Sequence, residues 1–167
     1  MGDLSAHSLL TPLLLTHLCL FRQLYLSNNR LCGVWNEYGT QKGNYNAEGI
    51  NAIADALRVN GVLTSIDLSG NQLCGIWTDY YGNEQGTYTA EGITAIADAL
   101  RHGGLTALNL SNNYLKDEGV SAVCEAIQTN KETKLASLNF ENNGIGPVGA
   151  NAVVAMVAVT GALTKIE

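Results

Sequence analysis

Charged side chains are scarce in this chain: Asp, Glu, Lys and Arg make up 14% of its 167 residues, whereas soluble proteins typically carry about 25%. Most of the surface must therefore consist of neutral polar groups. Nine Lys and Arg are outnumbered by fifteen Asp and Glu, which gives a net charge of −6, and no segment gathers the basic residues. Because a nucleic-acid backbone requires clustered basic side chains, we expect no nucleic-acid partner.

Long uninterrupted hydrophobic segments are also missing. The longest apolar run, residues 9–21, is broken by two threonines, a proline and a histidine, so it falls short of the roughly 20 residues that span a bilayer. Its flank carries Asp3 and no Lys or Arg, which argues against a signal peptide. We therefore expect no membrane contact, a cytoplasmic location and reduced thiols.

Residue groups that carry catalysis or hold metals are not visible either. The three histidines have no Ser or Cys partner at an equivalent position, and the four cysteines lack the spacing of metal ligands. Asp79, Asn83 and Glu84 do not match the spacing of a calcium loop, and no phosphate-binding glycine loop occurs. We expect a protein without enzymatic activity, cofactor or metal.

What the sequence does contain is an internal repeat. The pattern Leu-x-x-Leu-x-Leu-x-x-Asn-x-Leu, with Phe or Ile at some Leu positions, occurs four times, and a fifth copy starts at Leu163. The copies start at residues 21, 63, 105, 135 and 163, so the spacing is 42, 42, 30 and 28 residues. The matching residues are Phe21, Leu24, Leu26, Asn29 and Leu31; Leu63, Ile66, Leu68, Asn71 and Leu73; Leu105, Leu108, Leu110, Asn113 and Leu115; and Leu135, Leu138, Phe140, Asn143 and Ile145.

Each repeat combines a short strand with an amphipathic helix. A strand as short as Leu24-x-Leu26 must pair with its counterpart in the next repeat, so a parallel sheet results. Farther along each repeat, apolar residues recur with the helical spacing i, i+3, i+4, i+7. A glycine precedes each expected helix, and three of these glycines follow a Glu, where a helix start favours negative charge. The stripes are Ile50, Ile53, Ala54, Leu57; Ile93, Ile96, Ala97, Leu100; Val120, Val123, Cys124, Ile127; and Ala150, Val153, Val154, Val157.

One polar position of the repeat is expected to be structural. Where a strand bends into the following loop, its backbone groups lose their partners in the sheet, and a buried amide can satisfy them. Substitution of one such amide by Ala should cost about 1–3 kcal/mol. The residues at this position are Asn29, Asn71, Asn113 and Asn143.

The third repeat, LTALNLSNNYLKDEGVSAVCEAI, resembles the long, helix-bearing leucine-rich repeats of ribonuclease inhibitor, of NOD-like-receptor sensor regions and of Ran GTPase-activating protein. The resemblance covers about residues 21–167. It implies an α/β leucine-rich-repeat solenoid, a curved horseshoe segment with a parallel β-sheet on the concave face and α-helices on the convex face. It also implies a non-catalytic protein-binding module, a sensor or scaffold fragment of a larger protein; activation of a small GTPase rests on the family analogy alone.

The expected organisation is a leader or capping helical segment at 1–20, four repeats at 21–62, 63–104, 105–134 and 135–162, and the start of a fifth at 163–167. The first two repeats are longer because they carry inserts at about 32–48 and 74–91. Long surface insertions cost little loop entropy. We therefore expect that trimming residues 34–46 to a short turn leaves the chain folded.

The two inserts resemble each other and are rich in aromatic residues. They should lie side by side on one edge of the solenoid and form an aromatic ledge that binds a protein partner. Two other interpretations remain open: the matching aromatics pack on each other with no ligand, or they stack on a glycan or a small molecule. The insert residues are Trp35, Tyr38, Tyr45, Trp77, Tyr80, Tyr81 and Tyr88.

The concave face of the expected sheet is the second candidate surface. The side chains that alternate with the core leucines are small, polar and mildly acidic. A cationic partner would suit this face, although a solvated sheet without a ligand explains the same residues. The candidates are Gln23, Tyr25, Asp67, Asn109, Asn139 and Glu141.

Two cysteines of the inserts are expected to lie close together. Cys32 and Cys74 share a repeat position, so a disulfide or shared metal is geometrically possible, and a reduced buried pair is favoured.

At the C-terminal end, residues 150–159 are apolar almost all round, with Met156 and Val159 off the main stripe. We expect this end to self-associate, or to be covered by further repeats.

Overall fold

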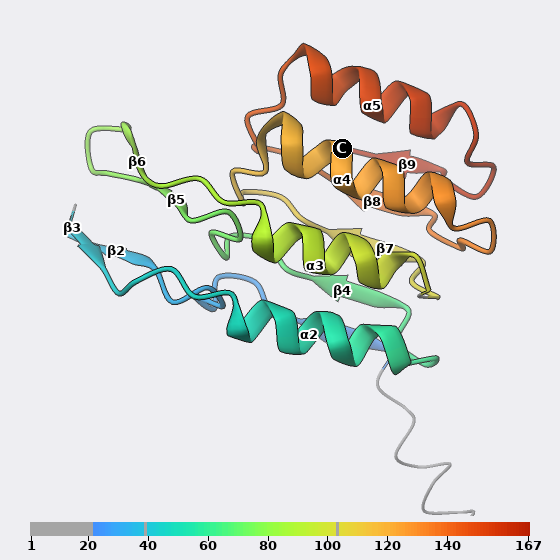
Figure 1. The fold of residues 1–167 in the computed structure, drawn as a ribbon, viewed down its shortest axis with the longest axis horizontal. Helices are drawn as coiled ribbons and strands as arrows, with labels where there is room; N and C mark the ends of the chain where they lie inside the picture. Colours follow the sequence, from blue (N-terminus) through green and yellow to red (C-terminus); the bar gives the residue numbers. More distant parts are fainter. Residues whose placement is uncertain (1–21, 39, 103) are drawn as a thin grey trace, which may run out of the picture.

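The computed structural model describes residues 22–38, 40–102 and 104–167. In these residues, strands and helices alternate along the chain to form a solenoid whose helices all lie on one side of the main sheet (Figure 1). The predicted α/β architecture is confirmed. The leader at 1–20 lies outside the described residues. The strands are β1 (Gln23–Tyr25), β2 (Trp35–Glu37), β3 (Thr40–Lys42), β4 (Ser65–Asp67), β5 (Ile76–Thr78), β6 (Glu84–Gly86), β7 (Ala107–Asn109), β8 (Ser137–Asn139) and β9 (Lys165–Ile166); the helices are α2 (Glu48–Val59), α3 (Glu91–Leu100), α4 (Lys116–Thr129) and α5 (Pro147–Val157).

The main sheet contains one strand from each repeat. Its order is β1-β4-β7-β8-β9, and every pair of neighbours is parallel. The residue at the centre of the repeat pattern is in register throughout, so that Leu24 pairs with Ile66, Ile66 with Leu108, and Leu108 with Leu138. Each strand pairs with its counterpart in the next repeat, as its shortness requires.

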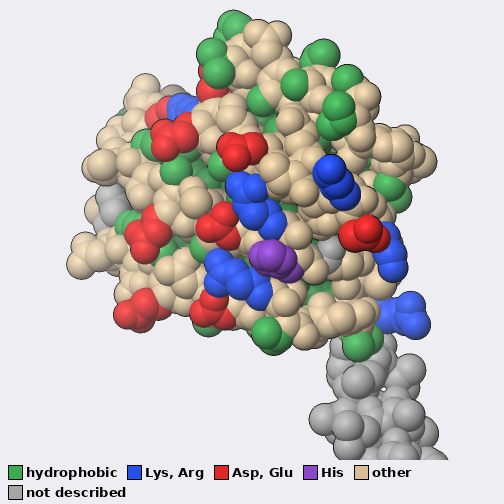
Figure 2. Space-filling view, turned by 45° about the vertical axis from the view of Figure 1, so that its right-hand side comes forward, with side chains coloured by type: hydrophobic (Ala, Val, Ile, Leu, Met, Phe, Trp, Pro, Cys, Tyr) green, Lys and Arg blue, Asp and Glu red, His purple; other side chains and the backbone are tan. Residues whose placement is uncertain are grey.

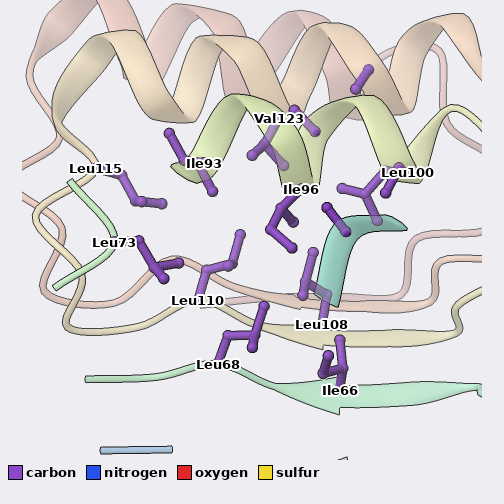
Figure 3. Packing of buried hydrophobic residues seen from close by; sticks show 14 of the residues in the cluster. Ile66, Leu68, Leu73, Ile93, Ile96, Leu100, Leu108, Leu110, Leu115 and Val123 are labelled. Carbon is purple, nitrogen blue, oxygen red and sulfur yellow. The ribbon is translucent and has the colours of Figure 1, made fainter. Parts of the chain in front are cut away.

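The core lies between the sheet and the helices, and the leucines of the strands point toward the helical stripes (Figure 3). The predicted stripes of α2, α3 and α4 face this core. In the last repeat the predicted stripe is wrong: Ala150, Val154 and Val157 are exposed, whereas Gly149 and Met156 are buried. A helix that is apolar on every side gives no sequence signal for its buried face, so its neighbours determine that face.

The repeated glycines lie inside the first turn of each helix, not before it as the sequence suggested. A Cβ atom on Gly49 would lie 2.5 Å from the carbonyl oxygen of Leu31, and one on Gly92 would lie 2.9 Å from that of Leu73. These distances are shorter than van der Waals contact. Glycine is needed here because the start of each helix packs directly against the end of the strand loop.

The two inserts form β-hairpins, a structure that the sequence analysis did not assign to them. Strands β2 and β3 pair antiparallel, with Trp35 opposite Lys42. Strands β5 and β6 do the same, with Trp77 opposite Gln85. Both hairpins project from the edge where the helices begin, and they lie side by side, with β2 in contact with β5 (Figure 1).

The C-terminal end presents an apolar surface. Val154 is 68% exposed, whereas its counterparts Ala54, Ala97 and Cys124 are buried under the following repeat. In the space-filling view, hydrophobic side chains gather at the top of the molecule, where α5 lies (Figure 2). Self-association through this end stays a prediction.

Candidate functional site

The repeated asparagines join each strand loop to its neighbours. The Oδ1 atom of Asn71 accepts a hydrogen bond from the backbone N–H of Asn29 at 2.9 Å, and its Nδ2 donates to the carbonyl oxygens of Leu26 and Leu68 at 2.8 and 2.9 Å. Asn113 and Asn143 repeat this arrangement one step farther along, and all three are buried.

Asn29 differs from the other three. It is exposed, and its side-chain amide donates to the carbonyl oxygen of Ser27 at 3.1 Å. No described residue precedes β1 in the sheet, so Asn29 has no neighbouring loop to bind within the described ranges. The expected burial is therefore wrong at this one position.

The bases of the hairpins belong to the core. Cys32, Val34, Cys74, Ile76 and Trp77 are all buried, and Trp77 is only 5% exposed. Trimming residues 34–46 would remove part of this core. The expectation that the chain stays folded when residues 34–46 are trimmed stays a prediction, and the buried Val34 is the core side chain that this change would remove.

Two of the predicted binding tyrosines connect successive repeats. The hydroxyl of Tyr45 donates to the carbonyl oxygen of Leu73 at 3.0 Å and accepts from the N–H of Gly92 at 3.2 Å, at the start of α3. The hydroxyl of Tyr88 donates to Leu115 in the same way at 2.8 Å. Both side chains are half-buried and packed against the core. Their polar atoms are already occupied, so they anchor the hairpins instead of offering a contact.

The aromatic residues of the predicted ledge therefore fall into two groups: those at the hairpin bases are buried or half-buried, and those at the hairpin tips are exposed. Trp77 cannot form part of a ledge because it is buried. Trp35 is half-buried, with the guanidinium of Arg30 4.8 Å from its ring centroid. At the tips, by contrast, Tyr38 is 100% exposed, and Tyr80 and Tyr81 are each 85% exposed.

The tip of the second hairpin is held by one carboxylate. Asp79 accepts hydrogen bonds from the backbone N–H groups of Asn83 and Tyr81 at 2.8 and 2.9 Å, and from the Gln85 amide at 3.1 Å. The bond from Asn83 is the main reason why the pKa of Asp79 lies below its ordinary value. Gly82 adopts a left-handed φ of +85°, which closes the turn. The rings of Tyr80 and Tyr81 meet edge to face, with centroids 5.6 Å apart.

The concave face offers fewer free groups. Asp67, Asn109 and Asn139 each use a side-chain oxygen to accept the backbone N–H two residues ahead. Tyr25 is exposed and donates to Gln23 at 2.9 Å. A hollow of about 180 Å³ lies over the strand centres, and Glu141 is exposed. Among the predicted site residues, the concave face has one exposed aromatic side chain, Tyr25, whereas the hairpin tips have three.

The described cysteines are buried and free. Burial raises the pKa of Cys32 to about 11, against the opposing effect of a hydrogen bond with Tyr45, and raises that of Cys74 to about 12. At pH 8 only about one Cys32 thiol in a thousand would be the reactive thiolate. We expect native protein at pH 8 to leave Cys32, Cys74 and Cys124 unmodified by iodoacetamide, and denatured protein to react fully. Peptide mapping by mass spectrometry measures each site separately; rapid labelling of native Cys32 would contradict its burial.

Two kinds of site are not found within the described ranges. No group of three or more His, Cys, Asp or Glu residues there could hold a metal ion. No helix in this part of the chain is long and apolar enough to cross a membrane.

Comparison with known families identifies the repeat. The family model described as Leucine Rich repeat matches residues 105–124 and 131–154, which cover most of the third and fourth repeats. No curated protein gives a significant match. The two matched segments contain β7, β8 and most of α4 and α5.

Proposed function

Because the chain is a leucine-rich-repeat protein, we propose that it is a non-catalytic recognition module that binds a protein partner through the tips of its two hairpins. The observation that carries the proposal is the contrast within each insert. The bases are buried in the core, whereas Tyr38, Tyr80 and Tyr81 at the tips are almost fully exposed. Aromatic side chains on a rigid support lose little entropy on binding, which suits them as anchors at protein interfaces.

The turn around Asp79 supports this proposal. Its hydrogen bonds hold the second tip in one conformation, and the ion pair between Lys116 and Glu84 ties β6 to the third repeat. Thr78 is also hydrogen-bonded to Tyr114, in the loop that follows β7. A preorganised surface of this kind binds at a smaller entropic cost than a mobile loop.

A glycan or planar ligand suits this surface less well. Stacking on a sugar ring requires an open, flat aromatic face, but Trp77 is buried and the Tyr80 and Tyr81 rings stand edge to face. We further propose that the chain belongs to the ribonuclease-inhibitor-like class within the wider family. Its described helices of 10–14 residues support that assignment.

The proposal is tested with a triple variant, Tyr38→Ser, Tyr80→Ser and Tyr81→Ser, in the full chain. A partner captured by the wild-type chain from its own cells is purified and titrated by calorimetry. We expect the triple variant to bind about tenfold more weakly or worse, because exposed tyrosine anchors are among the strongest contributors to protein interfaces. Its circular dichroism should match the wild type, since these side chains support no core contact.

Tyr25→Ser is the matched control, because it removes an exposed tyrosine from the concave face. It should change the dissociation constant by less than about twofold. Loss of binding in the control together with unchanged binding by the triple variant would move the site to the concave face. A captured ligand that loses its affinity on deglycosylation would contradict the choice of a protein partner.

A further inference from the structure

The sequence contains two Asn-Gly steps, Asn60–Gly61 and Asn143–Gly144. In such a step the backbone nitrogen of the glycine can attack the side-chain amide carbon of the asparagine, because glycine has no side chain to obstruct the approach. A bond forms between that nitrogen and Cγ, the bond from Cγ to Nδ2 breaks, and Nδ2 leaves as ammonia with the proton of the glycine nitrogen. Water then opens the succinimide ring at either carbonyl, which gives aspartate or isoaspartate.

The structure protects Asn143 from this reaction. Asn143 is buried, and its Oδ1 accepts hydrogen bonds from the N–H groups of Asn113 and Leu115 at 3.0 and 3.2 Å. Its Nδ2, which would be the leaving group, donates to the carbonyl oxygens of Leu110 and Phe140 at 2.9 and 2.8 Å. Movement of this amide would break these bonds inside the core, where water cannot replace them.

Asn60 lies in a different environment. It follows the last residue of α2 and is exposed, and its Oδ1 accepts from the N–H groups of Val62 and Leu63 at 2.8 and 2.7 Å. Its Nδ2 has no hydrogen-bond partner among the described residues. Gly61 is exposed as well, and a Cβ atom there would meet nothing within 4 Å. The turn at 60–62 can therefore open into solvent, where water replaces its two hydrogen bonds.

Opening of the turn decides how fast the reaction runs. Asn60 has a ψ of 109°, which directs the nitrogen of Gly61 away from the Asn60 side chain, so the backbone must rotate before the two groups can bond. At Asn60 this rotation breaks exposed hydrogen bonds, whereas at Asn143 the amide would have to leave buried ones. Local opening of exposed turns costs far less free energy than opening of the core.

We propose that Asn60 is a site of spontaneous deamidation in the folded protein and that Asn143 is not. The proposal is independent of recognition by the hairpin tips, because Asn60 follows the end of α2 and the hairpins project from the edge where the helices begin (Figure 1).

Deamidation changes both the charge and the backbone of this turn. Aspartate adds a negative charge at the C-terminal end of α2, where the helix dipole disfavours it, although its carboxylate can still accept from Val62 and Leu63. Isoaspartate also inserts the former side-chain carbon into the main chain between α2 and β4. The product is a chain whose connection from the first repeat to the second is altered.

The test incubates the folded full chain at pH 8 and follows both asparagines by peptide mapping with mass spectrometry. We expect the modified fraction at Asn60 to grow about tenfold faster or more than that at Asn143. In the chain unfolded by guanidinium chloride, the two sites should react at similar rates, because only the shared dipeptide then matters. An Asn60 that stays unmodified in the folded chain, or equal rates at the two sites in the folded chain, would overturn the proposal.

Gly61→Ala is the matched variant. Alanine fits at this position without a clash, because its Cβ meets nothing within 4 Å. The added methyl group should slow modification of Asn60 by about tenfold, since it obstructs the attack by the backbone nitrogen. An unchanged rate at Asn60 in this variant would show that the modification does not proceed through the Gly61 nitrogen and would overturn the proposal.

Discussion

Replacing Asn113 by Ala is expected to lower the free energy of unfolding by about 3 kcal/mol, at the upper end of the range that the repeat pattern suggested. The side chain accepts from the N–H of Asn71 at 2.9 Å and donates to the carbonyl oxygens of Leu68 and Leu110 at 3.0 and 2.9 Å. Asn113 is fully buried, so water cannot replace the lost amide. Each backbone group left unpaired costs about 1–3 kcal/mol, and this substitution leaves several.

Asn29→Ala is the control for this substitution, because it changes the same residue type at the same repeat position. Its exposed amide donates to Ser27, so the loss should be below about 1 kcal/mol. Urea denaturation followed by circular dichroism measures both variants. Equal losses of unfolding free energy at the two positions would contradict the inference that burial makes the repeated asparagines stabilising.

Trp77→Ala is expected to have a comparable effect, about 3–5 kcal/mol, which is typical of a large aromatic residue removed from a core. The indole anchors the second hairpin and is 5% exposed. Trp77→Phe should cost clearly less, because the indole N–H is buried without a hydrogen-bond partner among the described residues and its removal leaves no partner unsatisfied. Thermal unfolding monitored at 222 nm compares the two.

Tyr80→Ala is the matched control for the hairpin. Its side chain is 85% exposed and touches the Tyr81 ring at the tip, so stability should change by less than about 0.5 kcal/mol. If Trp77→Ala were as harmless as Tyr80→Ala, the hairpin base would not be part of the core.

The repeat pattern predicted the strands, the parallel sheet and the helical faces of the first three described repeats. It could do so because the apolar residues at the centre of each strand, such as Ile66 and Leu108, recur at fixed spacing and each repeat buries them in the same way. The last helix could not be oriented from sequence. Val154 and Met156 are both apolar, and only the presence or absence of a neighbouring helix separates the exposed residue from the buried one.

The division of the inserts into buried bases and free tips was also not predictable from residue type. Trp77 and Tyr80 are both aromatic and stand three positions apart, yet one is buried and the other exposed. Pairing of β5 with β6 fixes which part of the insert returns to the core. The sequence contained one usable signal. Tyr45 and Tyr88 lie in nearly identical short segments of the two inserts, and in the structure the hydroxyl groups of both tyrosines bind the backbone of the next repeat.

Hydrogen exchange of the full chain with and without its captured partner tests recognition by the hairpin tips most directly. We expect slower exchange on binding in residues 35–42 and 76–86, which form the two hairpins, and unchanged exchange in the strands of the main sheet. Protection confined to β1, β4, β7 and β8, with no change in either hairpin, would contradict recognition by the tips and assign the partner to the concave face.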